Sequence, residues 1–196
     1  ARVCRPCRLR AVARKADEVV DGCDLSTSTS QHVQCLKAST SFVARYLARG
    51  NSPKVLTRAE AVALGAAGIP LVSVWESGRP TTAGYFSRQA GVADGRDAVL
   101  LARKIGQPRN TPIYFAVDYD AAVAHVQGPI REYFQGVGES IAAASSAGDP
   151  YRVGVYGSGR VCRMITVAGL AMRSWLAQSR GWAESATYQA WDIKQL

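Results

Sequence analysis

The chain has 196 residues, 47% of them hydrophobic, and a formal net charge of +9. This length favours one globular domain, and no apolar run approaches the roughly 18 residues that a membrane-spanning helix needs. The first fifteen residues hold six of the 24 basic residues and no acidic residue. The charge excess is therefore concentrated in a tail, which does not indicate a nucleic-acid partner. We expect residues 1–17 to be a flexible basic segment, with at most a short helix over 9–15.

The five cysteines give no clear indication of a compartment. Cys4 and Cys7 have C-x-x-C spacing, but no second pair of ligands follows at a spacing typical of zinc sites. The low cysteine density in a chain of this length also argues against a disulfide framework. We expect no bound metal and at least one thiol without an intramolecular partner.

Strands and helices alternate along the rest of the chain. A helix is expected to begin within 26–30, and Thr57 and Glu60 form a capping box at the start of an Ala-rich helix. A long loop over 77–96 precedes a helix capped by Asp94 or Asp97, and two more helices are predicted over 130–147 and 161–170. Seven strands are predicted, over 18–24, 41–47, 70–76, 111–120, 151–156, 173–179 and 187–193.

This alternation predicts parallel βαβ units and an α/β fold. No Gly-rich dinucleotide fingerprint follows the first strand, so a TIM-type (β/α) barrel is favoured over a Rossmann sheet. We therefore expect a single barrel domain over 18–196. Because only seven strands are predicted, the eighth strand is expected to be missing or truncated.

The strand over 111–120 carries the strongest indication of chemistry. Alternate residues of a strand share a face, so Ile113, Phe115 and Val117 form an apolar side. Asp118 and Asp120 lie together on the other side, at the strand's carboxyl end. Ligands bind at this end of the strands in barrel enzymes.

Other acids recur near predicted strand ends, with aromatic and amide groups beside them. Glycoside cleavage requires two such acidic groups. One acid protonates the leaving oxygen, and a second carboxylate attacks, activates water or stabilises positive charge. A single acid at such a position, as at Asp24 or Asp192, can equally cap a helix or pair with an arginine. The candidate catalytic residues are Asp24, Glu76, Asp118 and Asp120, and the candidate substrate-binding residues are Arg45, Tyr46, Trp75, Tyr156, Trp175, Gln178 and Asp192.

Several motifs together resemble the Rv2525c-like, glycoside-hydrolase-like family. They include AAGIPLVSVWE (66–76), PIYFAVDYD (112–120), YRVGVYGSG (151–159), SWLAQS (174–179) and YQAWDIKQ (188–195). The resemblance covers about residues 19–196 and implies a TIM barrel related to the lysozymes of glycoside hydrolase family 25. In those lysozymes the corresponding strand ends in D-x-E, whose Glu is taken as the general acid. Here it ends in Asp118-Tyr119-Asp120, while Asp24 matches the acid of their first strand.

The resemblance implies a protein directed at peptidoglycan or a related polysaccharide. The leading hypothesis is a glycoside hydrolase in which Asp120 or Glu76 is the acid, Asp118 the base or stabiliser and Asp24 an auxiliary group. A second hypothesis is a glycan-binding protein that keeps the scaffold without turnover. A third takes Asp118-x-Asp120 as the metal-binding motif of a sugar-nucleotide transferase. Several family members are exported, so we expect a secreted or wall-associated protein, although the chain shows no complete signal peptide. We also expect a monomer without a cofactor.

Overall fold

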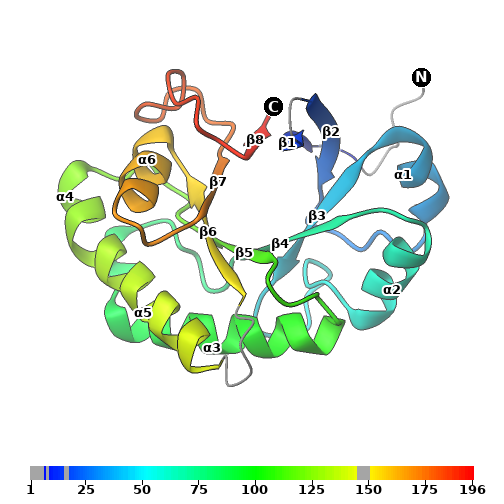
Figure 1. Ribbon diagram of the computed structural model, residues 1–196, viewed down its shortest axis with the longest axis horizontal. Coiled ribbons are helices and arrows are strands. Elements are labelled where there is room, and N and C mark those ends of the chain that lie inside the picture. Colours follow the sequence, from blue (N-terminus) through cyan, green and yellow to red (C-terminus); the bar gives the residue numbers. More distant parts are fainter. Residues whose placement is uncertain (1–6, 8, 16–17, 145–150) are drawn as a thin grey trace.

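The computed structural model describes residues 7, 9–15, 18–144 and 151–196, which form a closed eight-stranded barrel (Figure 1). Strands β2 to β8 are parallel and follow chain order, and β1 lies antiparallel between β2 and β8. The predicted TIM-type barrel is confirmed. The strands are β1 (Leu9–Lys15), β2 (Glu18–Asp24), β3 (Phe42–Leu47), β4 (Leu71–Trp75), β5 (Pro112–Ala116), β6 (Arg152–Gly157), β7 (Arg173–Leu176) and β8 (Ile193–Gln195).

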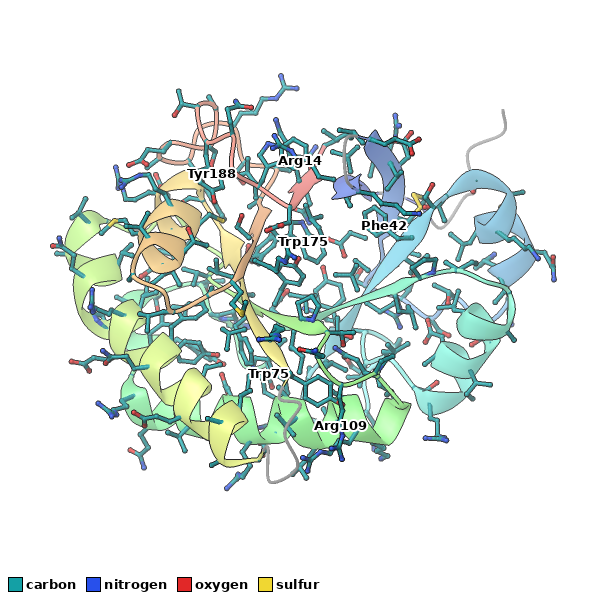
Figure 2. All side chains as sticks on the ribbon, viewed as in Figure 1. Arg14, Phe42, Trp75, Arg109, Trp175 and Tyr188 are labelled. Carbon is teal, nitrogen blue, oxygen red and sulfur yellow. A yellow bond between two sulfur atoms is a disulfide. The ribbon has the colours of Figure 1, made fainter. Side chains whose placement is uncertain are left out.

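The strand that closes the barrel is β1, which lies in the segment that we expected to be a flexible lead-in. The predicted helix over 9–15 is wrong, and an eighth strand is present. Ala11 is fully buried and belongs with the partly buried Ala13 to the cluster that fills the barrel. The exposed Arg14 lies with its guanidinium carbon 4.3 Å from the centroid of the Trp191 ring (Figure 2). The strand pairs with the adjacent β2 in a hairpin and with the distant β8. The pairing with β8 is not visible in the local sequence, and the basic residues made the segment resemble a solvated tail.

The helices cover the outside of the parallel strands (Figure 1). Within the described ranges, none is long and apolar enough to cross a membrane. The helices are α1 (Val33–Ser39), α2 (Arg58–Ala66), α3 (Arg88–Ile105), α4 (Val123–His125), α5 (Arg131–Ala143) and α6 (Gly159–Val167), with a 3-10 turn over Ala83–Tyr85 and a π-helical turn over Val126–Ile130.

Helix α3 begins earlier than the sequence indicated. Its cap is Ser87, whose hydroxyl accepts a hydrogen bond from the N–H of Ala90, and not Asp94 or Asp97. The predicted loop over 77–96 therefore contains the first turns of this helix. Glycines weaken the helical pattern there, but they allow close packing: a Cβ on Gly91 would lie 2.0 Å from a backbone oxygen of α5.

A disulfide joins Cys7 to Cys23, which immediately precedes Asp24 in β2, and Cys35 is disulfide-bonded as well. The expectation that a disulfide framework is unlikely is thus wrong. The C-x-x-C spacing did not reveal the pairing because Cys23 is distant in sequence from Cys7. Cys4 lies outside the described residues, and Cys162 is a buried free thiol. A disulfide is typical of proteins that fold outside the reducing cytoplasm.

One apolar cluster fills the inside of the barrel, and another packs between the strands and the helices. Tyr114 and Ala116 of β5 belong to the inner cluster, whereas Ile113, Phe115 and Val117 pack in the outer cluster with the helices. This division agrees with the alternation predicted from sequence. It directs the side of the strand that ends in Asp118 toward the inside of the barrel.

Candidate active site

Asp24 ends β2 at the carboxyl mouth of the barrel, and only 3% of it is exposed. Its Oδ2 accepts hydrogen bonds from Gln195 Nε2 at 2.5 Å and from the Tyr46 hydroxyl at 3.3 Å. Its buried Oδ1 meets no hydrogen-bond donor within the described part of the chain. Burial raises the pKa of Asp24 from 3.8 to about 6, although both hydrogen bonds lower it. Asp24 can therefore hold a proton in weakly acidic solution.

Glu76 and Asp118 follow the neighbouring strands β4 and β5. Lys54 Nζ lies 2.6 Å from Glu76 Oε1 and 4.2 Å from the centroid of the Tyr46 ring. Burial raises the pKa of Asp118, and the negative charge of Glu76 raises it further, while Lys54 lowers it. Glu76 and Lys54 also influence the pKa of Asp24. The three acids therefore form one electrostatic group with a single cation, which we call the carboxyl cluster (Asp24, Glu76, Asp118 and Lys54).

An amide that was not predicted from the sequence, Gln195, completes the carboxyl cluster. Gln195 donates to Asp24, and its Oε1 accepts hydrogen bonds from the Tyr156 hydroxyl at 3.0 Å and the Gln178 N–H at 3.2 Å. Tyr156 in turn packs edge-on against Trp175, with ring centroids 5.4 Å apart. Gln195 was missed because the last strand was placed over 187–193, whereas β8 spans Ile193–Gln195.

The same shift in β8 moves Asp192 to the opposite end of the barrel. Asp192 precedes β8, and its carboxylate accepts hydrogen bonds from the Ser174 N–H at 2.7 Å and from Arg173 at 2.8 Å. It therefore joins the amino ends of β7 and β8. The prediction that Asp192 lies at the mouth is therefore wrong, and its role is structural.

Two aromatic residues predicted to bind sugar occupy different layers. Trp175 is fully buried in the inner cluster, where it forms part of the floor beneath Tyr156. Trp75 is 1% exposed and belongs to the outer cluster, on the side of β4 that faces the helices (Figure 2). Trp75 thus lies outside the barrel, between the strands and the helices. Trp175 lies inside the barrel and packs against Tyr156. Of the predicted aromatic contacts, Tyr46 and Tyr156 lie beside the carboxyl cluster.

Arg45 does not face the mouth either. It is completely buried on the outer side of β3, where Nε lies 2.7 Å from Glu60 Oε1. Its guanidinium also donates to the carbonyl of Leu25, which follows Asp24, and to the carbonyl of Lys54, at 2.6 and 3.0 Å. Arg45 is thus placed to hold the backbone of two site loops, which corrects the expectation that it contacts a substrate.

Asp120 lies apart from Asp118, although both were predicted to share a site. Its exposed carboxylate accepts a hydrogen bond from the Ala183 N–H at 2.9 Å, in the β7–β8 loop. The charges that shift the pKa of Asp118 are those of Glu76 and Lys54, and Asp120 is not among them. Within the described ranges, no three His, Cys, Asp or Glu side chains gather closely enough to hold a metal ion.

Comparison with proteins of known sequence finds a matching family model and two similar proteins. Residues 34–195 match the model of the Rv2525c-like, glycoside hydrolase-like domain. The uncharacterized protein FadG of Bacillus subtilis is 30% identical over 174 residues, which cover 85% of this chain and 29% of FadG. The uncharacterized protein YbfG of the same organism is 33% identical over 125 residues, 62% of this chain and 17% of YbfG. The chain thus spans less than a third of either relative.

Solved structures show the same fold. The Tat-secreted protein Rv2525c of Mycobacterium tuberculosis, solved with HEPES and with L-tartrate, superposes with a TM-score of 0.69 at 20% and 22% identity. The match covers 87% of this chain and 83% or 82% of Rv2525c. A B. stearothermophilus protein superposes with a TM-score of 0.56 at 20% identity, covering 78% of this chain and 71% of that chain. From its sequence match, the chain belongs to the Rv2525c-like, glycoside hydrolase-like family.

Proposed function

We propose that the protein is a glycoside hydrolase that cleaves a cell-wall polysaccharide, such as peptidoglycan, at the carboxyl cluster. The observation that carries the proposal is the convergence of three acids from β2, β4 and β5 on one mouth, with the pKa values of Asp24 and Asp118 raised. Glycoside cleavage uses one carboxyl that holds a proton and another that is ionised, in different environments.

Asp118 and Glu76 suit these two roles. Asp118 is half-buried and its pKa is raised, so it can protonate the oxygen that leaves the sugar. Glu76 is paired with Lys54 and remains partly exposed, so its carboxylate can attack, activate water or stabilise positive charge. Asp24 lies too deep for direct contact with a polymer and is assigned an auxiliary role. Tyr46 and Tyr156 supply hydroxyl and ring surfaces beside the acids.

Secretion is part of the same proposal. The Cys7–Cys23 disulfide is stable where the surroundings are oxidising, as they are outside the cytoplasm. The structurally similar Rv2525c is a Tat-secreted protein. A wall polysaccharide would be accessible to this protein in that compartment.

The test is the release of reducing ends from peptidoglycan and a panel of neutral and acidic glycans. The variants D118N and E76Q are compared with D120N, which removes a similar charge outside the carboxyl cluster. We expect D118N and E76Q to lose about a hundredfold or more of the rate, and D120N to stay within a few-fold. Thermal unfolding of each variant checks that the fold is intact. Equal rates in the wild type, D118N and E76Q would refute the assignment.

A glycan-binding protein without turnover is the second candidate. It is favoured by Asp120, which occupies the position of the general acid in the related lysozymes but contacts the Ala183 N–H. Under this alternative the wild type releases no reducing ends from any glycan of the panel. It still binds one of them in pull-down, and Y156F weakens that binding.

A further inference from the structure

A cavity opens between β8 and the loop that joins β7 to β8. Its volume is about 270 Å³. Gln195 lines this cavity and its side chain donates to Asp24, so one residue belongs to both sites. Gln178 is a second link, because it lines the cavity and its N–H donates to Gln195 Oε1. The residues that carry the argument are Gln178, Arg180, Ser185, Lys194 and Gln195.

The charged side chains that line this cavity are both cations, Arg180 and Lys194. Neither forms an ion pair with any residue that the structure describes. By contrast, the cation of the carboxyl cluster is neutralised, because Lys54 pairs with Glu76. The cavity therefore combines uncompensated positive charge with the amide and hydroxyl groups of Gln178 and Ser185.

We propose that this cavity binds an oxyanion substituent of the polysaccharide, most simply a carboxylate, on a sugar next to the bond that is cleaved. The inference deepens the proposed function and rests on it. The carboxyl cluster contains three acids and one cation, so it repels an anionic sugar placed directly over it. An acidic group that lies over Arg180 and Lys194 avoids this repulsion. A guanidinium also matches the planar oxygens of a carboxylate or phosphate better than other side chains do.

The test compares an acidic glycan with a neutral one of similar length. The acidic probe is peptide-free peptidoglycan strands, whose lactyl groups carry carboxylates, and the neutral probe is chitin oligosaccharide. Isothermal titration calorimetry measures the binding of each to wild type and to R180Q/K194Q. The control K104Q/R109Q removes the same charge from two exposed residues, Lys104 in the last turn of α3 and Arg109 in the loop before β5. Arg109 lies at the opposite edge of the molecule from the β7–β8 loop (Figure 2).

We expect R180Q/K194Q to weaken binding of the acidic strands about tenfold at low salt and to leave chitin oligosaccharide within twofold. The control variant should change neither. A phosphate-bearing wall polymer serves as a third probe, and a larger loss with it than with the strands would assign the oxyanion to phosphate. Equal losses for acidic and neutral probes, or equal losses in the control, would overturn the proposal.

This readout is independent of turnover. If the wild type cleaves no glycan, the proposed hydrolase fails, while selective loss of acidic-glycan binding in R180Q/K194Q still supports the oxyanion site. If cleavage occurs but the variant binds all probes normally, the oxyanion site fails and the hydrolase stands.

Discussion

The buried ion pair between Arg45 and Glu60 offers a prediction whose size follows from the structure. Both side chains are completely buried, and Glu60 Oε1 also accepts hydrogen bonds from the N–H and hydroxyl of Thr29, at 2.9 and 2.7 Å. Through the carbonyls of Leu25 and Lys54, Arg45 joins the loops after β2 and β3. Removing one charge leaves the other buried without its partner.

Breaking such a pair from one side costs about 3–5 kcal/mol, because the remaining charge keeps its desolvation penalty. We therefore expect E60Q and R45M each to lower the free energy of unfolding by about 3 kcal/mol. The double variant R45M/E60L should lose much less than the sum of the two single changes, since no buried charge remains. Urea denaturation, with the midpoint and slope fitted for each variant, measures these values.

The control is the ion pair between Arg88 and Glu139, whose side chains are about half exposed. Replacing either partner with Gln should cost under about 1 kcal/mol. Losses of this small size in E60Q and R45M, or strict additivity in the double variant, would refute the reasoning.

The same pair predicts a dependence on pH. Burial alone would raise the pKa of Glu60, but the hydrogen bonds from Arg45 and Thr29 outweigh burial and lower it below 4.5. A lowered carboxyl pKa stabilises the fold above the ordinary value, and that stabilisation disappears as pH falls through the folded-state pKa. The wild type should therefore lose stability relative to R45M/E60L below about pH 4.5.

Three further predictions concern the carboxyl cluster and its scaffold. The raised pKa of Asp24 means that ionising it above about pH 6 destabilises the fold, by about 3 kcal/mol relative to pH values below 3.8. D24N should therefore raise the unfolding free energy at pH 8 by up to this amount and add nothing near pH 3.5, and a gain that does not vary with pH would contradict the assignment. The Cys7–Cys23 bond closes a loop with a sequence separation of 16, so C7A/C23A should lose about 3 kcal/mol in urea unfolding, and a change under 1 kcal/mol would show that the bond does not constrain the unfolded chain. On α5, G136A places a Cβ 2.2 Å from a backbone oxygen of α3 and should cost about 1–3 kcal/mol, whereas G138A meets nothing within 4 Å and should be neutral or stabilising; equal thermal shifts would count against the close helix contact.

The sequence by itself determined the repeating strand–helix order and the faces of β5. Period-two alternation depends only on local backbone geometry, so Ile113 and Phe115 could be assigned to one side and Asp118 to the other. The carboxyl ends of parallel strands meet at one mouth, so Asp24, Glu76 and Asp118 could be grouped without coordinates.

Only the tertiary structure decided which side chains reach that mouth. Arg45 and Trp75 lie at strand ends as predicted, but they project toward the helices, because alternation does not reveal the absolute side of each strand. Asp192 was predicted at the carboxyl end of the last strand, but Gln195 occupies that end. A strand of only three residues has too little periodicity for its bounds to be found from sequence. The strand β1 pairs with the adjacent β2, but its second partner, β8, lies more than 170 positions away in the chain, and only that pairing closes the barrel. Pairing over such distances is decided by the closure of the barrel as a whole, which a local pattern of residues does not encode.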